Sequence, residues 1–109
     1  MSHPAVLLAE PDDGRSVTLR VGEAVGVSLP ENASTGYRWA VESLDPGTIE
    51  ALDPIPHYGS ATVGSAGVVE WRFLAKAPGT TTVVLKLWRH WEGDKSIIRR
   101  FRFQASVTP

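Results

Sequence analysis

The chain has 109 residues, with 11 Lys and Arg against 12 Asp and Glu, a formal net charge of −1 and no cysteine. This length fits one domain, residues 1–109, whose core is large enough to fold without a disulfide or a metal. The lack of thiols excludes a cysteine nucleophile, a disulfide framework and thiolate metal sites, and a charge this close to zero argues against nucleic acid as a partner.

Several other classes of function also find no support in the sequence. No run approaches the roughly 18 apolar residues of a membrane span, and the N-terminus lacks the basic lead of a signal peptide. We expect a soluble protein, cytoplasmic as written and secreted or periplasmic if a signal was removed. The three histidines, His3, His57 and His90, lie far apart in the sequence. No local metal motif is therefore present, and we expect no cofactor.

Apolar and polar residues alternate with a period of two along most of the chain, which predicts strands with one buried face. In chain order, the alternating runs are 17–21, 25–29, 37–41, 71–73, 83–87 and 101–105. Pro and Gly punctuate the sequence between them, for example at Pro30, Pro46-Gly47 and Pro78-Gly79. About seven to eight short strands in roughly 100 residues predict an all-β fold, an immunoglobulin-like antiparallel β-sandwich with no disulfide.

Charge is distributed unevenly along the chain. Residues 1–60 carry three Arg against nine acidic residues, whereas residues 86–103 carry six basic residues against two acidic ones. We interpret the basic stretch as a solvated face of the last two strands. The alternative is a basic stripe that attracts an anionic partner.

Three loops between the predicted strands have unusual sequences. They are Asn32-Ala33-Ser34-Thr35-Gly36-Tyr37, Val63-Gly64-Ser65-Ala66-Gly67-Val68 and Trp88-Arg89-His90-Trp91-Glu92-Gly93. The first predicts a tight turn, because Asn, Ser and Thr side chains bond nearby backbone and glycine accepts a positive φ. The second lacks the lysine and the following helix of a phosphate-binding loop. The third brings Arg and Trp to a loop tip, where such residues often anchor a partner, although a core position for either Trp is the alternative.

Taken together and in order, the three loops resemble the signature loops of the chagasin family of cysteine peptidase inhibitors. In that family the loops read N-P-T-T-G-Y/F, G-x-G-G and R-P-W, and the resemblance extends from about Val17 to Val107. It implies an immunoglobulin-like sandwich whose three loops form a wedge. The family inserts this wedge into the active-site cleft of papain-like cysteine peptidases, reversibly and without a covalent bond.

The resemblance also implies roles for individual residues. Thr35 and Gly36 would lie nearest the catalytic cysteine of the peptidase, Gly64 and Gly67 would contact the cleft through their backbone, and Arg89 and Trp91 would pack on the other side. The implied inhibitory residues are Asn32, Ser34, Thr35, Gly36, Tyr37, Gly64, Ser65, Ala66, Gly67, Arg89, His90 and Trp91. None of them is expected to be catalytic or to bind a metal.

Three residues depart from the family pattern. Ala33 replaces a proline and so removes a fixed φ from the first loop. Ala66 replaces a glycine of the second motif and adds a methyl group. His90 replaces the proline of the third motif and adds a group that can become charged near neutral pH. These changes predict weaker inhibition, a different target peptidase or loss of the activity.

Two other functions are alternatives to an inhibitor. A sandwich module that binds a glycan or a protein through its exposed Trp residues is the first. An enzyme is the second, and we exclude it because there is no G-x-S-x-G elbow, while His57 and Asp12-Asp13 fit edge and turn positions. We therefore expect a monomer whose partner is a papain-like cysteine peptidase, with no nucleic acid or membrane as a partner.

Overall fold

A computed structural model describes residues 4–57 and 67–109 of the chain. These residues form nine strands and four short 3₁₀ helices. The strands are β1 (Val6–Ala9), β2 (Ser16–Arg20), β3 (Ala24–Glu31), β4 (Arg38–Ser43), β5 (Ile49–Ala51), β6 (Ile55–His57), β7 (Gly67–Ala75), β8 (Gly79–Trp88) and β9 (Arg99–Thr108). The 3₁₀ helices are η1 (Glu10–Asp12), η2 (Ala33–Thr35), η3 (His90–Glu92) and η4 (Asp94–Ser96). No helix in these two stretches is long and apolar enough to cross a membrane.

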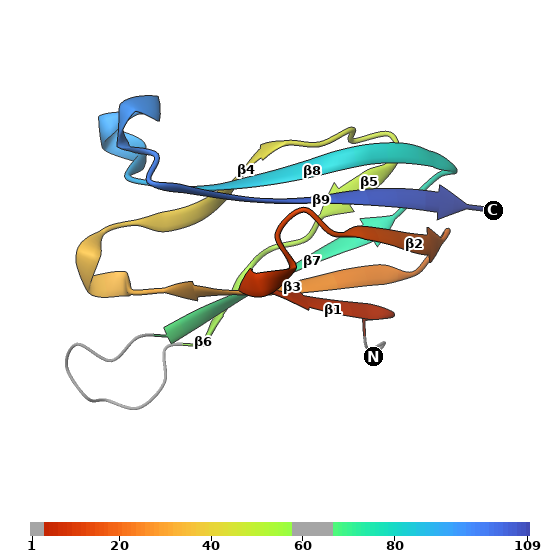
Figure 1. The fold of residues 1–109 in the computed structure, drawn as a ribbon, viewed down its shortest axis with the longest axis horizontal. Coiled ribbons are helices and arrows are strands. Elements are labelled where there is room, and N and C mark those ends of the chain that lie inside the picture. Colours follow the sequence, from red (N-terminus) through yellow and green to blue (C-terminus); the bar gives the residue numbers. More distant parts are fainter. Residues whose placement is uncertain (1–3, 58–66) are drawn as a thin grey trace.

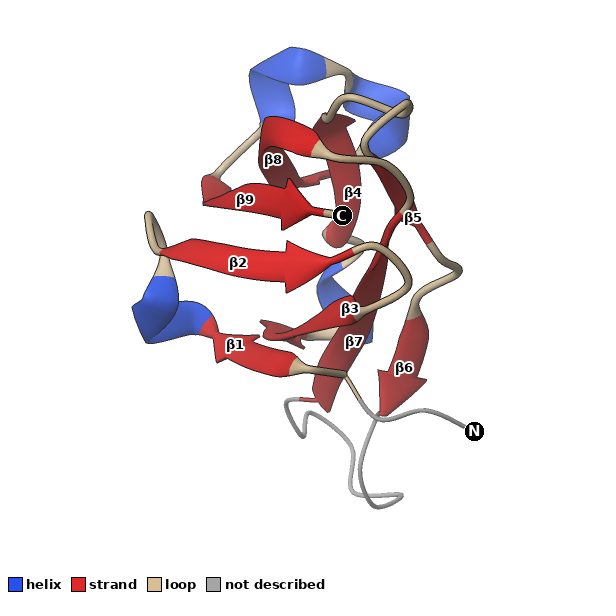
Figure 2. Cartoon of the chain, turned by 90° about the vertical axis from the view of Figure 1, so that its right-hand side faces the viewer, coloured by secondary structure: helices blue, strands red, loops and turns tan. Residues whose placement is uncertain are grey.

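The strands form two sheets that pack face to face (Figure 1, Figure 2). One sheet has the order β1-β3-β7-β5, and β6 also pairs with β7. The other sheet has the order β2-β9-β8-β4. Less and more exposed positions alternate along β7 and β9, as the period of two in the sequence predicts. The predicted all-β sandwich is confirmed.

The core between the sheets is built around three phenylalanines, Phe73, Phe101 and Phe103, each no more than 2% exposed. Phe73 on β7 meets Phe103 on β9 edge to face, with the ring centroids 5.5 Å apart. Because β7 and β9 belong to different sheets, this aromatic contact holds the two layers together. Trp71 extends the cluster along β7, 6.1 Å from the Phe73 ring.

The direction of two strand pairs differs from our expectation of antiparallel sheets. Five pairs among the described residues are antiparallel, but β1 runs parallel to β3, and β2 runs parallel to β9. The chain leaves β1 for the opposite sheet and returns to β3, and such a crossover allows parallel pairing. Alternation in a sequence reports which face of a strand is buried, and it carries no information on the direction of the neighbouring strand.

The described residues also contain more strands than the seven to eight that we predicted. The strands with no counterpart among the six alternating runs are short: β1 has four residues, and β5 and β6 have three each. Three or four residues are too few to establish a period of two. Pro56 within β6 is a further reason, because proline is depleted in strands other than edge strands.

The two described loops of interest lie at the same end of the sandwich. Figure 1 shows the connection from β3 to β4 and the connection from β8 to β9 at one end, with the C-terminus at the other. The turn between β2 and β3, which contains Val21, lies at the end opposite to these loops (Figure 1). The rigid sheets thus act as a platform that presents the loops.

We predict that Phe73→Ala lowers the free energy of unfolding by about 3–5 kcal/mol, because it leaves a cavity between the sheets. Urea unfolding followed by tryptophan fluorescence measures this loss. Val21, which is 44% exposed in the β2–β3 turn, supplies the control. Val21→Ala should change the free energy of unfolding by less than about 0.5 kcal/mol. Equal losses in the two variants would contradict the proposed role of Phe73.

One carboxyl group on the surface of the β2-β9-β8-β4 sheet has a shifted pKa. Glu42 on β4 accepts a hydrogen bond from Arg100 Nε on β9 at 2.7 Å. This hydrogen bond, together with the positive charge of Arg100, lowers the pKa of Glu42 from its ordinary value. Because folding lowers the pKa of Glu42, its interaction with Arg100 stabilises the folded state above the ordinary pKa of Glu42. This stabilisation is lost as the pH falls through the lowered pKa of the folded state.

We predict that Arg100→Gln raises the pKa of Glu42 to its ordinary range, because the charged hydrogen-bond donor is removed. Carboxyl carbon chemical shifts, followed by NMR as the pH is lowered, measure this change. Arg99→Gln is the matched control, since Arg99 pairs with Glu10 instead. A Glu42 pKa that is the same in the Arg100 variant and in the wild type would contradict the prediction.

Candidate functional site

The first loop, residues 32–37, connects β3 to β4 and is folded by its own side chains. Asn32 Oδ1 accepts hydrogen bonds from the backbone N–H of Ser34 at 3.0 Å and from its hydroxyl at 2.7 Å. The N–H and the hydroxyl of Thr35 both donate to the Asn32 carbonyl, at 3.2 and 2.8 Å. These local hydrogen bonds produce the single turn η2. The predicted tight turn is confirmed.

Gly36 turns the chain at the end of this loop. Its φ is +79°, in the left-handed region that favours glycine, as its sequence context predicts. The next N–H, that of Tyr37, donates to Thr35 Oγ1 at 3.3 Å. The backbone at Thr35 and Gly36 is therefore bent rather than extended.

The third loop follows β8 and is organised by Ser96, which is only 7% exposed. The Ser96 hydroxyl oxygen accepts the N–H of Arg89 at 3.0 Å. The same hydroxyl lies within donating distance of the carbonyls of Gly93, at 2.7 Å, and Arg89, at 3.0 Å. The sequence does not point to Ser96, because a serine in a polar segment carries no signal of burial. It closes the loop back on its first residue.

Arg89 connects the third loop to the first. Its Nε and Nη2 both donate to the carbonyl oxygen of Thr35, at 3.2 and 3.0 Å. The guanidinium carbon also lies 4.4 Å from the centre of the Tyr37 ring, and Nη1 lies 3.5 Å from Glu92 Oε2. The side chain is 34% exposed. Arg89 therefore has an internal role, holding two loops together, that its position in a sequence motif did not reveal.

Trp91 covers Gly36 and still presents most of its indole to solvent. A methyl group on Gly36 would lie 2.9 Å from Trp91 Cη2, so only glycine allows the ring to lie this close. Trp91 is 61% exposed, which rules out a core position, and the His90 ring meets it edge to face at 5.1 Å. Trp88, by contrast, is half-buried, with Lys86 Nζ 3.5 Å from its ring centre. An exposed indole over a glycine turn provides apolar surface for a partner.

Only one of the four second-motif residues that we predicted in the site lies among the described residues. Gly64, Ser65 and Ala66 fall outside them. Gly67 is buried and begins β7, where it pairs with Glu31, the last residue of β3. Because Glu31 directly precedes the first loop, the end of the second motif lies beside the start of the first loop.

The residues that we set aside as catalytic candidates have structural partners. His57 lies on β6, with Nε2 3.3 Å from Glu70 Oε1 on β7. Asp13 Oδ1 accepts the backbone N–H of Arg102 at 2.9 Å. Across residues 4–57 and 67–109, no group of three or more His, Asp or Glu could hold a metal ion.

Four of the six basic side chains of residues 86–103 form ion pairs with acidic ones. The pairs are Lys86 with Asp94, Arg89 with Glu92, Arg99 with Glu10, and Arg100 with Glu42. Two of the four acidic partners come from the acidic first half of the chain. This pairing favours the interpretation of the basic stretch as a solvated face over that of a stripe for an anionic partner.

Comparison with solved structures shows that two other proteins have the same fold. The crystal structure of a cysteine protease inhibitor from Entamoeba histolytica, EhICP2, matches with a TM-score of 0.82 and 24% identity over 97% of this chain and 100% of that one. PbICP-C, solved in complex with falcipain-2, matches with a TM-score of 0.70 and 16% identity over 99% of this chain and 94% of that one.

Comparison of sequences identifies the family of the chain. Chagasin of Trypanosoma cruzi is 31% identical over 113 residues, which cover 93% of this chain and 94% of the relative. Amoebiasin-2 of Entamoeba histolytica is 30% identical over 107 residues, which cover 93% of this chain and 84% of the relative. The model of the chagasin family peptidase inhibitor I42 matches residues 18–105. The chain therefore belongs to the chagasin family of cysteine peptidase inhibitors, whose members are inhibitors and not enzymes.

Proposed function

We propose that this protein blocks papain-like cysteine peptidases reversibly by inserting loops 32–37, 64–67 and 89–91 into the active-site cleft. In this arrangement Thr35 and Gly36 approach the catalytic cysteine, and Trp91 packs on the enzyme surface beside the cleft. Gly64 and Gly67 contribute backbone contacts. The 109 residues act as one domain and as a monomer. Family membership favours this function over a generic glycan- or protein-binding module.

The observation that carries the proposal is that direct contacts hold the first and third loops together. Arg89 holds the Thr35 carbonyl with two hydrogen bonds, and Trp91 rests on Gly36. Loops that are already ordered lose little conformational entropy when they dock, so more of the contact energy remains as affinity. The exposed indole of Trp91 supplies the aromatic anchor that such an interface needs.

The same geometry explains how the first loop can meet a nucleophilic thiolate without being cleaved. Attack on a peptide bond requires its carbonyl oxygen to enter the oxyanion hole of the enzyme. The Thr35 carbonyl oxygen is already engaged by Arg89, and Gly36 bends the chain away from an extended course. The Thr35–Gly36 bond is therefore held in a conformation that opposes attack. A related inhibitor of the same fold, PbICP-C, has been solved in complex with falcipain-2, which supports a cysteine peptidase as the partner.

We predict reversible, competitive inhibition of papain, with Trp91→Ala raising the inhibition constant about 30-fold or more through loss of the aromatic anchor. Thr35→Arg should have a similar effect, because a long charged side chain replaces a small one at the loop tip and the hydrogen bonds of the Thr35 hydroxyl within the loop are lost. Titration of papain activity at several substrate concentrations measures both effects.

The control for this titration is Val21→Ala, which truncates an exposed apolar residue at the opposite end of the sandwich. It should inhibit as the wild type does, and none of these three variants should shift the thermal midpoint appreciably. A wild-type protein that inhibits no papain-like enzyme at micromolar concentration would contradict the proposed function.

We predict that Arg89→Met converts the inhibitor partly into a substrate, because the Thr35 carbonyl becomes free to enter the oxyanion hole. The inhibition constant should rise about tenfold for the loss of hydrogen bonds from a charged group. Mass spectrometry of an overnight incubation with papain should reveal chain cleavage within residues 32–37. Arg20→Met removes an exposed arginine at the other end of the sandwich and is the matched control. An intact Arg89→Met chain with wild-type inhibition would refute the internal role of Arg89.

A further inference from the structure

Glu31 is a buried carboxylate that neither the family motifs nor the proposed binding loops include. It is the last residue of β3, directly before the first loop, and is 5% exposed. A carboxylate is rarely buried to this extent unless it is hydrogen-bonded or paired with an opposite charge. Its surroundings therefore indicate a specific role.

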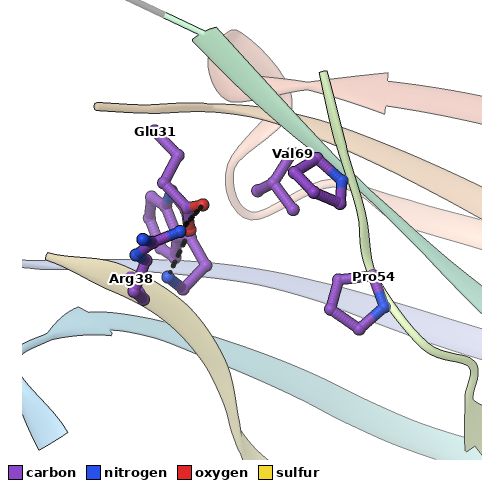
Figure 3. A pocket seen from close by; sticks show the side chains of 6 residues that line it. Glu31, Arg38, Pro54 and Val69 are labelled. Carbon is purple, nitrogen blue, oxygen red and sulfur yellow. Dashed lines mark hydrogen bonds and ion pairs between the residues drawn. The ribbon is translucent and has the colours of Figure 1, made fainter. Parts of the chain in front are cut away.

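The contacts of Glu31 join the two ends of the first loop. Its Oε2 accepts the backbone N–H of Trp39 at 2.8 Å, and its Oε1 lies 3.6 Å from Arg38 Nη1. Next to it, the Trp39 indole N–H donates to the Pro30 carbonyl at 2.8 Å. The loop leaves β3 at Glu31 and returns in β4 at Arg38, so these contacts close its base (Figure 3).

This closure also bridges the two sheets, because β3 and β4 belong to different ones. The strand β4 is an edge of its sheet, where a backbone N–H can lack a partner strand. Glu31 supplies the acceptor that the edge lacks at Trp39. The carboxylate thus takes the place of a neighbouring strand at this point.

The strand pairings of Glu31 and of its partner Trp39 link it to the strands β7 and β8. In the β3–β7 pairing, Glu31 lies opposite Gly67, the last residue of the second motif. Its partner Trp39 lies opposite Leu87 in the β4–β8 pairing, two residues before Arg89 of the third loop. The Glu31 side chain therefore joins β3 to β4, and the backbones of Glu31 and Trp39 are paired with β7 and β8.

A cavity of about 300 Å³ adjoins the Glu31 carboxylate. The cavity bears on what would happen if the carboxylate were removed. Besides Glu31, Arg38 and Trp39, its lining includes Pro54, Pro56 and Val69, whose side chains carry no hydrogen-bond acceptor (Figure 3). Without the carboxylate, water has room to enter and to satisfy the Trp39 N–H. Such a water is not attached to β3, so it restores a hydrogen bond without restoring the link between the strands.

We propose that Glu31 is a positioning residue that sets the base of the first loop, and through it the wedge that enters the peptidase cleft. The inference rests on the proposed function for its effect on inhibition, but its effect on the loop itself is independent of any peptidase. Glu31 contacts no part of the enzyme in this proposal.

The test compares Glu31→Ala with Glu31→Gln. The Ala variant should raise the inhibition constant for papain about tenfold, because the loop loses its anchor. It should also speed amide hydrogen exchange at Ser34, Thr35 and Trp39 by a similar factor. The Gln variant keeps an oxygen that can accept the Trp39 N–H, so it should remain within about threefold of the wild type in both measurements.

The control for general destabilisation is Thr48→Val, which removes a buried hydroxyl that donates to Asp45 Oδ2. Thr48 lies beside Gly79, which begins β8 at the end opposite to the third loop, so this variant should lose stability and keep the wild-type inhibition constant. Equal losses of inhibition in Thr48→Val and Glu31→Ala, at equal unfolding free energy, would show that Glu31 is merely structural.

Two further results would overturn the proposal. The first is a Glu31→Ala variant with wild-type exchange at the loop amides. The second is a Glu31→Gln variant with the same losses of inhibition and of exchange protection as the Ala variant. That result would show that the hydrogen bond to the Trp39 N–H is not what positions the loop. The exchange measurement needs no peptidase, so it decides the role of Glu31 even if the wild type fails to inhibit papain.

Discussion

The pair of hydrogen bonds from Arg89 to the Thr35 carbonyl is the interaction on which the functional end of this protein depends. It joins two loops that arise from different strand connections and leaves them with one common orientation. The Trp91 indole can lie on Gly36 only because that position carries no side chain. A blocking inhibitor requires such order, because flexible loops would lose entropy on docking and would also adapt to the enzyme as substrates do.

The sandwich beneath these loops acts as a rigid frame. The Phe73–Phe103 contact couples the sheets in the core, and Glu31 couples them again at the end that carries the loops. Ser96 performs the corresponding task inside the third loop, where it ties the chain back to Arg89. Contacts in the core, at the base of the first loop and within the third loop therefore each help to fix the loops, and none of them is a disulfide.

The near-neutral net charge of the chain is the sum of an acidic first half and a basic stretch near the C-terminus, and the fold brings parts of the two together. Acidic residues from the first half, such as Glu10 and Glu42, pair with Arg99 and Arg100 on the last strand. The charge asymmetry seen along the sequence is thus partly cancelled in space by these two pairs. What remains prominent at the loop end is the exposed indole of Trp91, and an aromatic surface of this kind suits a protein partner better than a strongly anionic one.

The amino-acid sequence by itself determined the all-β sandwich, its main strands and the Gly36 turn, because alternation and turn chemistry are properties of neighbouring residues. It missed β1, β5 and β6, which are too short to show a period, and it carried no information on which strands run parallel. Only the tertiary structure decided that Arg89 bonds to Thr35, 54 positions away, and that Glu31 and Ser96 are buried anchors. Such contacts depend on how distant strands are brought together, and no local pattern of residues encodes that arrangement.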